Sequence, residues 1–513
     1  MRIQNQQCTS IARRGSAVVV AAVLLGLAEE PARGATEIVR AGEDLQAAID
    51  RARPGDEIRL EAGAVFTGHF VLRARAGTNV APITIRTDGR LPSSRIRPQD
   101  AALLPTLTPA GASPVIRTEP GARYWRLVGL RIRGNGGNDL IVLGDGRAQA
   151  SGIPQQIELD RLLILGDPAR GQKRGIALNS AATTIRNCYI ADIKRVGEET
   201  QAIAGWNGPG PYLIENNYLE AAGISVLFGG TEPSIAGLVP SDITVRRNTM
   251  AKPVAWRGQR WMVKNLLELK NARRVRIEGN LFQHNWAAAQ AGFAILFTVR
   301  ASGSRATWST VRDVTFENNI VRRAAGGINI LGYDTNAVSQ QTRNLVIRNN
   351  LFYEIDHRAW GGNGWFLQVG NEPADILVEH NTILQSGNLV TAYGGTQFAP
   401  RPIRRFRFLN NIAWHNRYGL FGIGIGVGLP ALEAYFPGGE FTGNLLAGGS
   451  AARYPAGNRF ESADEVLAQF VNPTAGDFRL RPDSWARRDP VDGRPVGADL
   501  DAIKRAMGGA VVR

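Results

Sequence analysis

The chain has 513 residues, of which 44% are apolar and 20% charged. This composition supplies a large buried core and excludes a disordered tail or a mini-protein. The 59 Gly and 26 Pro favour a turn-rich chain over a helical bundle, and the formal net charge of +15 predicts an acidic partner.

Residues 1–34 have the pattern of an export signal. An arginine pair precedes an apolar run at residues 17–28, and a small-x-small triplet at 32–34 ends the segment. The run is too short to span a bilayer. We therefore expect a secreted or periplasmic protein without a transmembrane segment after cleavage, with a short membrane anchor as the alternative. The leader carries four Arg and two Glu, so its removal leaves a net charge of +13.

The cysteines and the charge restrict the partners. Cys8 would be lost with the leader, which leaves Cys188 as the only cysteine and excludes an internal disulfide. Cys188 takes a repeat position where other repeats carry Asn, which favours a buried structural side chain over a nucleophile. Because an exported protein is a poor candidate for binding genomic DNA, we expect an acidic polysaccharide, no nucleic acid, and a monomer.

The first elements of the mature chain predict a cap. Residues 45–52 form the pattern of a short amphipathic helix, and residues 54–60 turn from it into a first strand. A helix at this place would close the open end of a solenoid.

A short pattern then recurs through the middle of the chain: alternating apolar residues, an Asn, and a further apolar pair. It returns about every 30 residues, which is typical of a solenoid, and its period of two is that of strands. Asn side chains stacked at the strand spacing of about 4.8 Å can pair their amides from coil to coil. The marked positions are Cys188, Asn217, Asn248, Asn280, Asn319, Asn350, Asn381, Asn411 and Asn444.

Each repeat has a second strand after a Gly or Asn, as at 223–226, 327–330 and 364–369, which makes about three strands per coil. Parallel strands that wind in one sense and bury their Val/Ile rows form a right-handed parallel β-helix. The predicted fold class is therefore all-β, a single-stranded right-handed parallel β-helix with an N-terminal capping helix. Its predicted divisions are the signal peptide at 1–34, the β-helix at 35–470, and a C-terminal cap and tail at 471–513.

The opening helix, the Asn-marked coils and the closing segment together resemble the pectate-lyase-like right-handed β-helix superfamily, over roughly residues 36–500. The resemblance implies a substrate groove along the outside of one parallel sheet, between loops that protrude from the turns. That superfamily includes polysaccharide lyases, inverting glycoside hydrolases, epimerases, esterases and non-catalytic adhesins, so the resemblance does not select one activity.

The middle coils are the predicted place of the groove. They contain the long excursions between strands and six of the ten Trp. Exposed Trp faces suit sugar rings, and packing within the core or the loops is the alternative for each. The excursions are 231–242, 251–264, 300–310, 333–343 and 354–364.

The strand at residues 264–271 is the most unusual of the set. If Leu267 and Leu269 point inward, Glu268 and Lys270 point outward together, about 6.8 Å apart. Two charges on the presumed substrate sheet indicate a site, and a solvated ion pair on an exposed face is the alternative.

A lyase must remove the proton next to a uronate carboxylate and neutralise that carboxylate. We predict Lys270, Arg300, His357 and Glu268 as its catalytic residues. Oxygen ligands at Asp334 and Glu372 are the predicted place of a Ca²⁺ ion. Residues predicted to bind substrate are Asn329, Tyr333, Arg358, Gln368, Trp286 and Trp365. His284 is a minor candidate, while His380 and the other two His are interpreted as structural.

The function favoured by these residues is a secreted polysaccharide lyase that cleaves a uronate-containing glycan by β-elimination. Two alternatives stay open. Glu268 and Asp334 could be the two carboxylates of an inverting glycoside hydrolase, or the chain could be a non-catalytic surface or adhesive β-helix. An enzyme requires Glu268 and Lys270 at the floor of a groove walled by the 300–310 and 354–364 loops, whereas an adhesin would leave them on a flat, open sheet.

Overall fold

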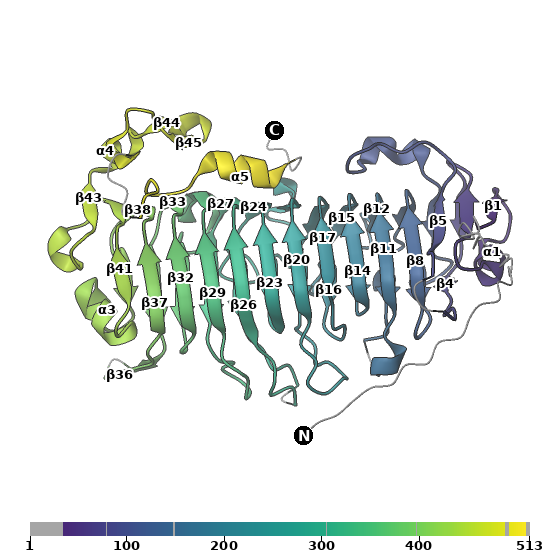
Figure 1. Cartoon of the computed structure of the whole chain (residues 1–513), viewed down its shortest axis with the longest axis horizontal. Coiled ribbons are helices and arrows are strands. Elements are labelled where there is room, and N and C mark those ends of the chain that lie inside the picture. The colour runs from purple at the N-terminus through teal and green to yellow at the C-terminus, as the bar shows by residue number, and fades with distance from the viewer. Residues whose placement is uncertain are drawn as a thin grey trace, which may run out of the picture. The chain divides into compact units, whose positions relative to one another are not determined.

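The computed structural model describes residues 34–77, 80–146, 149–303, 305–396, 398–487 and 492–508. Residues 1–33 of the leader predicted at 1–34 lie outside the described residues. Residues 36–461 form a parallel β-helix, in which three sheets of parallel strands run side by side along one axis (Figure 1). The predicted all-β solenoid is confirmed.

Each coil contributes one strand to each sheet, in the order sheet 1, sheet 3, sheet 2. Sheet 1 faces the viewer in Figure 1. Its strands are β1 (Thr36–Val39), β2 (Glu57–Leu60), β5 (Ile83–Thr87), β8 (Arg123–Val128), β11 (Gln155–Asp160), β14 (Ala181–Arg186), β17 (Tyr212–Glu215), β20 (Ser241–Arg246), β23 (Ala272–Glu278), β26 (Val311–Glu317), β29 (Arg343–Arg348), β32 (Ala374–Glu379), β37 (Arg404–Leu409) and β41 (Glu440–Thr442).

Sheet 2 is formed by the strand that the sequence places second in each repeat. Its strands are β4 (Phe70–Leu72), β7 (Ile116–Thr118), β10 (Asp139–Leu143), β13 (Arg174–Leu178), β16 (Gln201–Gly205), β19 (Ile224–Phe228), β22 (Asn265–Leu269), β25 (Phe293–Thr298), β28 (Gly326–Leu331), β31 (Leu367–Gly370), β34 (Val390–Tyr393), β39 (Leu420–Gly422) and the antiparallel β40 (Gly426–Val427).

Sheet 3 follows the Asn-marked turn of each coil. Its strands are β3 (Val65–Thr67), β6 (Thr106–Thr108), β9 (Arg131–Arg133), β12 (Leu163–Leu165), β15 (Tyr189–Ile193), β18 (Tyr218–Ala221), β21 (Thr249–Ala251), β24 (Leu281–Asn285), β27 (Ile320–Ala324), β30 (Leu351–Ile355), β33 (Thr382–Gln385), β38 (Ile412–Trp414), β42 (Leu445–Ala447) and β43 (Arg459–Glu461).

The remaining elements are short. Two antiparallel pairs join β35 (Gly395–Thr396) to β36 (Ala399–Pro400) and β44 (Phe470–Asn472) to β45 (Asp477–Leu480). The α-helices are α1 (Leu45–Arg51), α2 (His357–Trp360), α3 (Leu429–Tyr435), α4 (Ala463–Leu467) and α5 (Leu500–Met507). The 3-10 turns are η1 (Pro98–Leu103), η2 (Ala150–Gly152), η3 (Val254–Trp256), η4 (Ala451–Arg453), η5 (Pro473–Ala475) and η6 (Trp485–Arg487). Across the described residues, no helix is long and apolar enough to cross a membrane.

The core is a stack of like residues inside the tube. On sheet 1, Val275, Val314, Leu345, Ile376 and Phe406 are in register on successive strands and all are buried. Such a row buries each apolar side chain against its neighbours about 4.8 Å above and below it. The alternation predicted from the sequence therefore sends one face of every strand into the tube and the other to the outside.

The Asn ladder lies at the turn between sheets 1 and 3. The side-chain Oδ1 of Asn350 accepts from the backbone N–H and the Nδ2 of Asn319, at 2.9 and 3.1 Å, and Asn381 does the same for Asn350. The residue before each ladder Asn has a positive φ, as in Asn349 and His380, which makes the turn tight. Cys188 occupies the ladder position as predicted. It is buried, and burial raises the pKa of its thiol to about 12.

Helices meet the tube near both of its ends. Asp44 caps the start of α1, whose Leu45 and Ile49 are buried in the main core. Near the other end, Leu432 and Tyr435 of α3 join the same core.

The segment after β43 runs along the outside of sheet 3, where α5 lies over β24 and β27 in Figure 1. Leu500, Ile503 and Met507 of α5 pack in one cluster with Leu281 and Leu351 of sheet 3. This segment therefore covers the side of the tube.

Candidate functional site

The outer face of sheet 2 carries one row of aligned side chains across its middle strands. Glu268 on β22 is in register with Leu296 on β25, Leu296 with Asn329 on β28, and Asn329 with Gln368 on β31. The leucines on either side of Glu268 belong to the main core, as the alternation predicts. Glu268 therefore points away from the tube, toward the presumed substrate face.

Glu268 lies between two lysine ammonium groups. Its Oε1 is 3.5 Å from Nζ of Lys270 and its Oε2 is 3.9 Å from Nζ of Lys264. Nζ of Lys264 also donates to Oε2 of Glu199. Glu268 is only 2% exposed, so the pair is buried rather than solvated. Burial raises the pKa of Glu199, but the ammonium groups of Lys270 and Lys264 outweigh it and leave this pKa lowered.

Arg300 enters the same site from the next coil. It lies two residues beyond β25, and its backbone N–H donates to the carbonyl oxygen of Lys270 at 2.9 Å. Its Nη1 is 3.2 Å from Oδ1 of Asp334, whose other oxygen accepts from the backbone N–H of Ala301 at 2.8 Å. A carboxylate held in this way fixes the guanidinium in place. Lys270 and Arg300, predicted on neighbouring coils, are thus adjacent.

These side chains line a pocket of about 310 Å³ on the outer face of sheet 2. Three oxygen atoms of the lining, on Asn265, Glu268 and Asn329, have no hydrogen-bond donor among the described residues. Cationic groups beside unpaired acceptors suit a ligand that carries both a carboxylate and hydroxyl donors. The lining residues are Asn265, Glu268, Lys270, Gln290, Ala291, Gly292, Phe293, Leu296, Thr298, Arg300, Asn329 and Gln368.

Two loops flank the pocket. Residues 290–292 line it on the side where the sheet 2 strands begin. The backbone N–H of Ala287 donates to the carbonyl oxygen of Trp360 at 3.0 Å, so α2 supports this wall from behind. At the other end of the strands, Arg300 begins the 300–310 loop. The site is therefore recessed as an enzyme requires, but its first wall is the loop before β25 and not the 354–364 loop.

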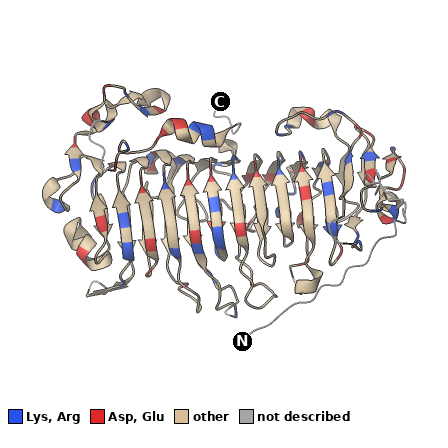
Figure 2. Cartoon of the chain, in the orientation of Figure 1, with Lys and Arg blue, Asp and Glu red and all other residues tan. Residues whose placement is uncertain are grey.

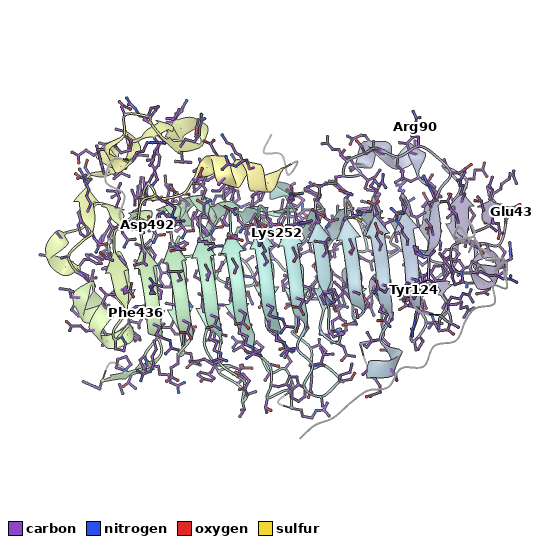
Figure 3. The ribbon with its side chains drawn as sticks, in the orientation of Figure 1. Glu43, Arg90, Tyr124, Lys252, Phe436 and Asp492 are labelled. Atoms are coloured by element: carbon purple, nitrogen blue, oxygen red, sulfur yellow. The ribbon has the colours of Figure 1, made fainter. Side chains whose placement is uncertain are left out.

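A buried lysine supports the start of β22 (labelled in Figure 3). Nζ of Lys252 donates to the carbonyl oxygens of residues 221–223 and of Asn265, at 2.9–3.0 Å. Burial, reinforced by the charge of Lys264, lowers the pKa of Lys252 well below its ordinary value. Lys252 gathers carbonyl groups of two coils and thereby sets the position of Asn265 in the pocket.

Several predicted site residues lie outside this pocket. His357 begins α2, where its Nδ1 is 2.8 Å from Oγ of Ser386, and Arg358 is exposed on the same helix. Tyr333 lines a different pocket.

The two predicted Trp are not in the pocket lining either. Trp286 is 6% exposed in a cluster with Trp256 and Val263, so its ring faces are not available to a sugar, and it packs the loops instead. Trp365 is half-buried against Gly387.

Asp334 is engaged in the site and is not a free carboxylate. It binds Arg300, and its side chain is only 4% exposed. Glu372, the second predicted calcium ligand, is 3.7 Å from Arg401. Within the described part of the chain no group of three or more His, Cys, Asp or Glu is arranged to hold a metal ion. Calcium binding at Asp334 and Glu372 stays a prediction. Asp334, held by Arg300, is poorly suited to act as the second carboxylate of a hydrolase.

Sequence reasoning overlooked two charged members of the site. Lys264 belongs to the strand predicted at residues 264–271, but its separation of four residues from Glu268 did not indicate that the two side chains meet. Glu199 comes from two coils earlier. An acidic pair at residues 198–199, just before a sheet 2 strand, was the available signal.

Comparison with known proteins bears on the fold. No family model matches the chain, and no curated protein matches it. A solved mannuronic acid specific polysaccharide lyase of family 6 from the human gut microbiota has a TM-score of 0.53 and 12% identity, over 92% of this chain and 98% of that one. The family 6 alginate lyase AlyGC has a TM-score of 0.50 and 15% identity, over 91% of this chain and 58% of the longer AlyGC chain.

A third solved structure, an alginate lyase from Paenibacillus sp. str. FPU-7, has a TM-score of 0.43 and 18% identity, over 62% of this chain and 95% of that chain. The two structures with the higher scores establish the architecture. The chain shares its parallel β-helix fold with these two lyases.

Proposed function

We propose that the protein is a polysaccharide lyase that cleaves a uronate-containing glycan by β-elimination in the pocket on sheet 2. One observation carries this proposal: Lys270 and Arg300 converge on one recessed pocket, and the buried carboxylates of Glu268 and Asp334 hold them. A uronate chain brings a carboxylate to the cations and hydroxyl groups to the unpaired oxygen acceptors. The likeness of the fold to lyases that act on alginate supports this substrate class.

The reaction assigns different roles to the two cations. An arginine keeps its proton in proteins, so Arg300 binds the uronate carboxylate and stabilises the negative charge that develops when the adjacent carbon loses its proton. Nζ of Lys270 first gives up a proton to solvent and then accepts the proton from this carbon. The electron pair of the C–H bond then forms a carbon–carbon double bond as the glycosidic C–O bond breaks, and the leaving oxygen takes a proton from the ammonium of Lys270 or from water.

Glu268 and Asp334 position these groups. Glu268 holds Lys270 over the pocket and offsets the charge of Lys264, while Asp334 orients the guanidinium of Arg300. The fixed geometry places base and charge clamp before the substrate arrives, which is the main source of rate in such a site. Export of the protein, expected from residues 1–34, would bring it to extracellular polysaccharide.

The test is an assay on alginate, pectate and a neutral glucan, which follows the ultraviolet absorbance of unsaturated uronate alongside reducing ends. Both signals rise with a polyuronate if the reaction is an elimination. Lys270→Ala then lowers kcat by about 10²–10⁴-fold, the usual contribution of a general base. The same assay with calcium or with a chelator tests the predicted Ca²⁺ site.

Lys504→Ala, an exposed lysine on α5, is the control and retains full activity. Reducing ends without absorbance would show a hydrolase. An absence of both signals across the panel, with a folded protein, would instead favour a binding β-helix.

A further inference from the structure

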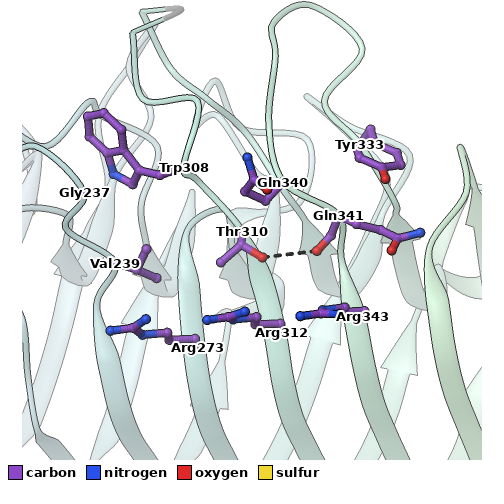
Figure 4. Close-up of a pocket in the computed structure, with 10 residues that line it drawn as sticks. All are labelled: Gly237, Val239, Arg273, Trp308, Thr310, Arg312, Tyr333, Gln340, Gln341 and Arg343. Atoms are coloured by element: carbon purple, nitrogen blue, oxygen red, sulfur yellow. Dashed lines mark hydrogen bonds between the residues drawn. The ribbon is translucent and has the colours of Figure 1, made fainter.

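A second pocket, of about 460 Å³, lies where the loops that follow sheet 2 enter sheet 1 (Figure 4). Arg273 on β23 is in register with Arg312 on β26, and Arg312 with Arg343 on β29. Neighbouring strands are about 4.8 Å apart, so three guanidinium groups stand in a row, here called the arginine row. Figure 4 shows them beneath Trp308 and Tyr333. No Asp or Glu is among the residues that line this pocket.

The arginine row contrasts with the rest of the same strands. Figure 2 shows basic and acidic residues together on sheet 1. Further along these three strands, Glu317 stands between Arg276 and Arg348, at 3.0 and 2.8 Å. Like charges opposite each other on neighbouring strands are destabilising. The arginine row has weaker support: Asp313 lies 3.7 Å from Arg312, and Asp242 and Asp375 interact with Arg273 and Arg343 through charge alone.

The arginine row also retains unused donors. Nε of Arg312 is buried without a hydrogen-bond partner, and its one ion pair, with Asp313, is 3.7 Å long. Arg343 is exposed, and its side chain makes no hydrogen bond or ion pair within the described residues. Nε of Arg273 donates to Oγ of Ser241 at 2.8 Å. The exposed guanidinium of Arg343, next in the row to those of Arg312 and Arg273, is suited to an external anion with several acceptor groups.

An aromatic side chain completes the pocket. Nε1 of Trp308 donates to the carbonyl oxygen of Leu238 at 3.0 Å, which fixes the indole above the arginine row. A fixed indole face suits the apolar face of a sugar ring. Tyr333 lines the pocket and precedes Asp334, the partner of Arg300, so one loop contributes to both the arginine row pocket and the candidate site.

We propose that the arginine row pocket binds a stretch of an acidic polysaccharide, as an anchoring site separate from the site of cleavage. Successive carboxylates of a polyuronate bind successive guanidinium groups, and Trp308 packs on a sugar ring. The choice of a glycan rests on the proposed function, whereas the preference for an anion rests on the arginine row alone. A chain long enough to occupy both pockets gains affinity without a change in the chemical step.

The test measures binding of a long oligouronate by calorimetry in the Lys270→Ala protein, which leaves the ligand intact. The triple variant Arg273→Gln/Arg312→Gln/Arg343→Gln is expected to bind at least about tenfold more weakly, since each charge-assisted contact contributes about that factor. Arg276→Gln/Arg348→Gln, on the same strands but paired with Glu317, is the matched control and retains its affinity.

The outcomes separate this site from the proposed function. Unchanged binding in the triple variant overturns the anchoring site, even if the protein is an active lyase. If the protein cleaves no glycan but the triple variant binds more weakly, the anchoring site stands and the proposed function fails. Tighter binding of a DNA duplex, or equal binding of inorganic phosphate, overturns the glycan as ligand. Denaturant unfolding of the triple variant checks its integrity, and removal of the like-charge repulsion is expected to leave it at least as stable.

Discussion

At the scale of single residues, the candidate site depends on a buried carboxylate between two ammonium groups. Removal of one partner from a buried ion pair leaves an uncompensated charge, which costs far more than the loss of an exposed pair. Glu268 has this position between Lys264 and Lys270, and no hydrogen-bond donor reaches its Oε2 among the described residues.

We therefore expect Glu268→Gln to lower both stability and activity. The free energy of unfolding, measured in urea, should fall by about 3 kcal/mol because Lys270 loses its counter-ion and Lys264 keeps only Glu199. Glu354→Gln removes the partner of Arg323 in a pair that is nearly half exposed, and it should cost less than about 1 kcal/mol. Equal losses in the two variants would contradict a special role for Glu268.

His284 on β24 predicts a pH dependence of stability. Burial and the charges of Arg323 and Arg322 lower its pKa to about 4, with Glu354 opposing them. Because the unfolded chain has the ordinary value of about 6.5, it binds the proton first as the pH falls. The stability contributed by neutral His284 is therefore complete above pH 6.5 and is lost as the pH falls toward 4.

The measurement is the unfolding midpoint of the wild type and of His284→Asn between pH 4 and 7. Asn tolerates the positive φ of this position. As the pH falls from 6.5 toward 4, the unfolding midpoint of the wild type should fall relative to that of His284→Asn. A constant difference between the two midpoints would show that His284 does not titrate with a lowered pKa.

At the scale of elements, each turn between sheets 1 and 3 depends on an Asn that serves two coils. Asn350 accepts from Asn319 and donates to the carbonyl oxygen of Phe316 at 2.9 Å, and its side chain is fully buried. The repeating unit is thus stabilised by side chains bonded to the neighbouring coil, as expected of a solenoid.

Asn350→Ala is expected to be strongly destabilising. It leaves buried N–H and C=O groups of neighbouring coils unpaired, at about 1–3 kcal/mol for each. Thr315→Ala, on the outer face of β26, should change the midpoint by little. Denaturant unfolding measures the free energy of unfolding of both variants. A loss below about 1 kcal/mol for Asn350→Ala would show that water replaces the hydrogen bonds of this ladder Asn.

At the scale of the whole molecule, the last helix joins distant coils. Asp499 donates its backbone N–H to Asn349, and the backbone of Gly497 bonds to Asn410. Gly279 has a positive φ, and a Cβ at this position would come within 2.6 Å of the carbonyl oxygen of Ala506. Glycine at this turn thus permits the close approach of α5.

Ile503 is the buried anchor of that helix. Ile503→Ala should lower the unfolding free energy by about 2–5 kcal/mol, as for other truncations of buried aliphatic residues, while Lys504→Ala on the exposed face should not. Limited proteolysis should also cut the Ile503 variant faster after residue 492. Resistance equal to that of the wild type would mean that α5 docks without this contact.

The sequence alone predicted the solenoid, its period, the eight ladder Asn, the opening helix and the sheet that carries Glu268 and Lys270. These features arise from local alternation and from repeats, which a linear pattern records directly. The sequence also predicted that Lys270 and Arg300 belong to one site, because they occupy matching positions of the repeat on adjacent coils.

The tertiary structure decided the rest. It buried Glu268 between Lys270 and Lys264, bound Asp334 to Arg300, packed Trp286 into a loop cluster and aligned the three arginines of the second pocket. Loops of unequal length and the direction of long side chains decide such contacts, and neither follows the repeat. The physical reason is that register is a property of the backbone period, whereas the meeting of two flexible side chains depends on the three-dimensional path of the chain between them.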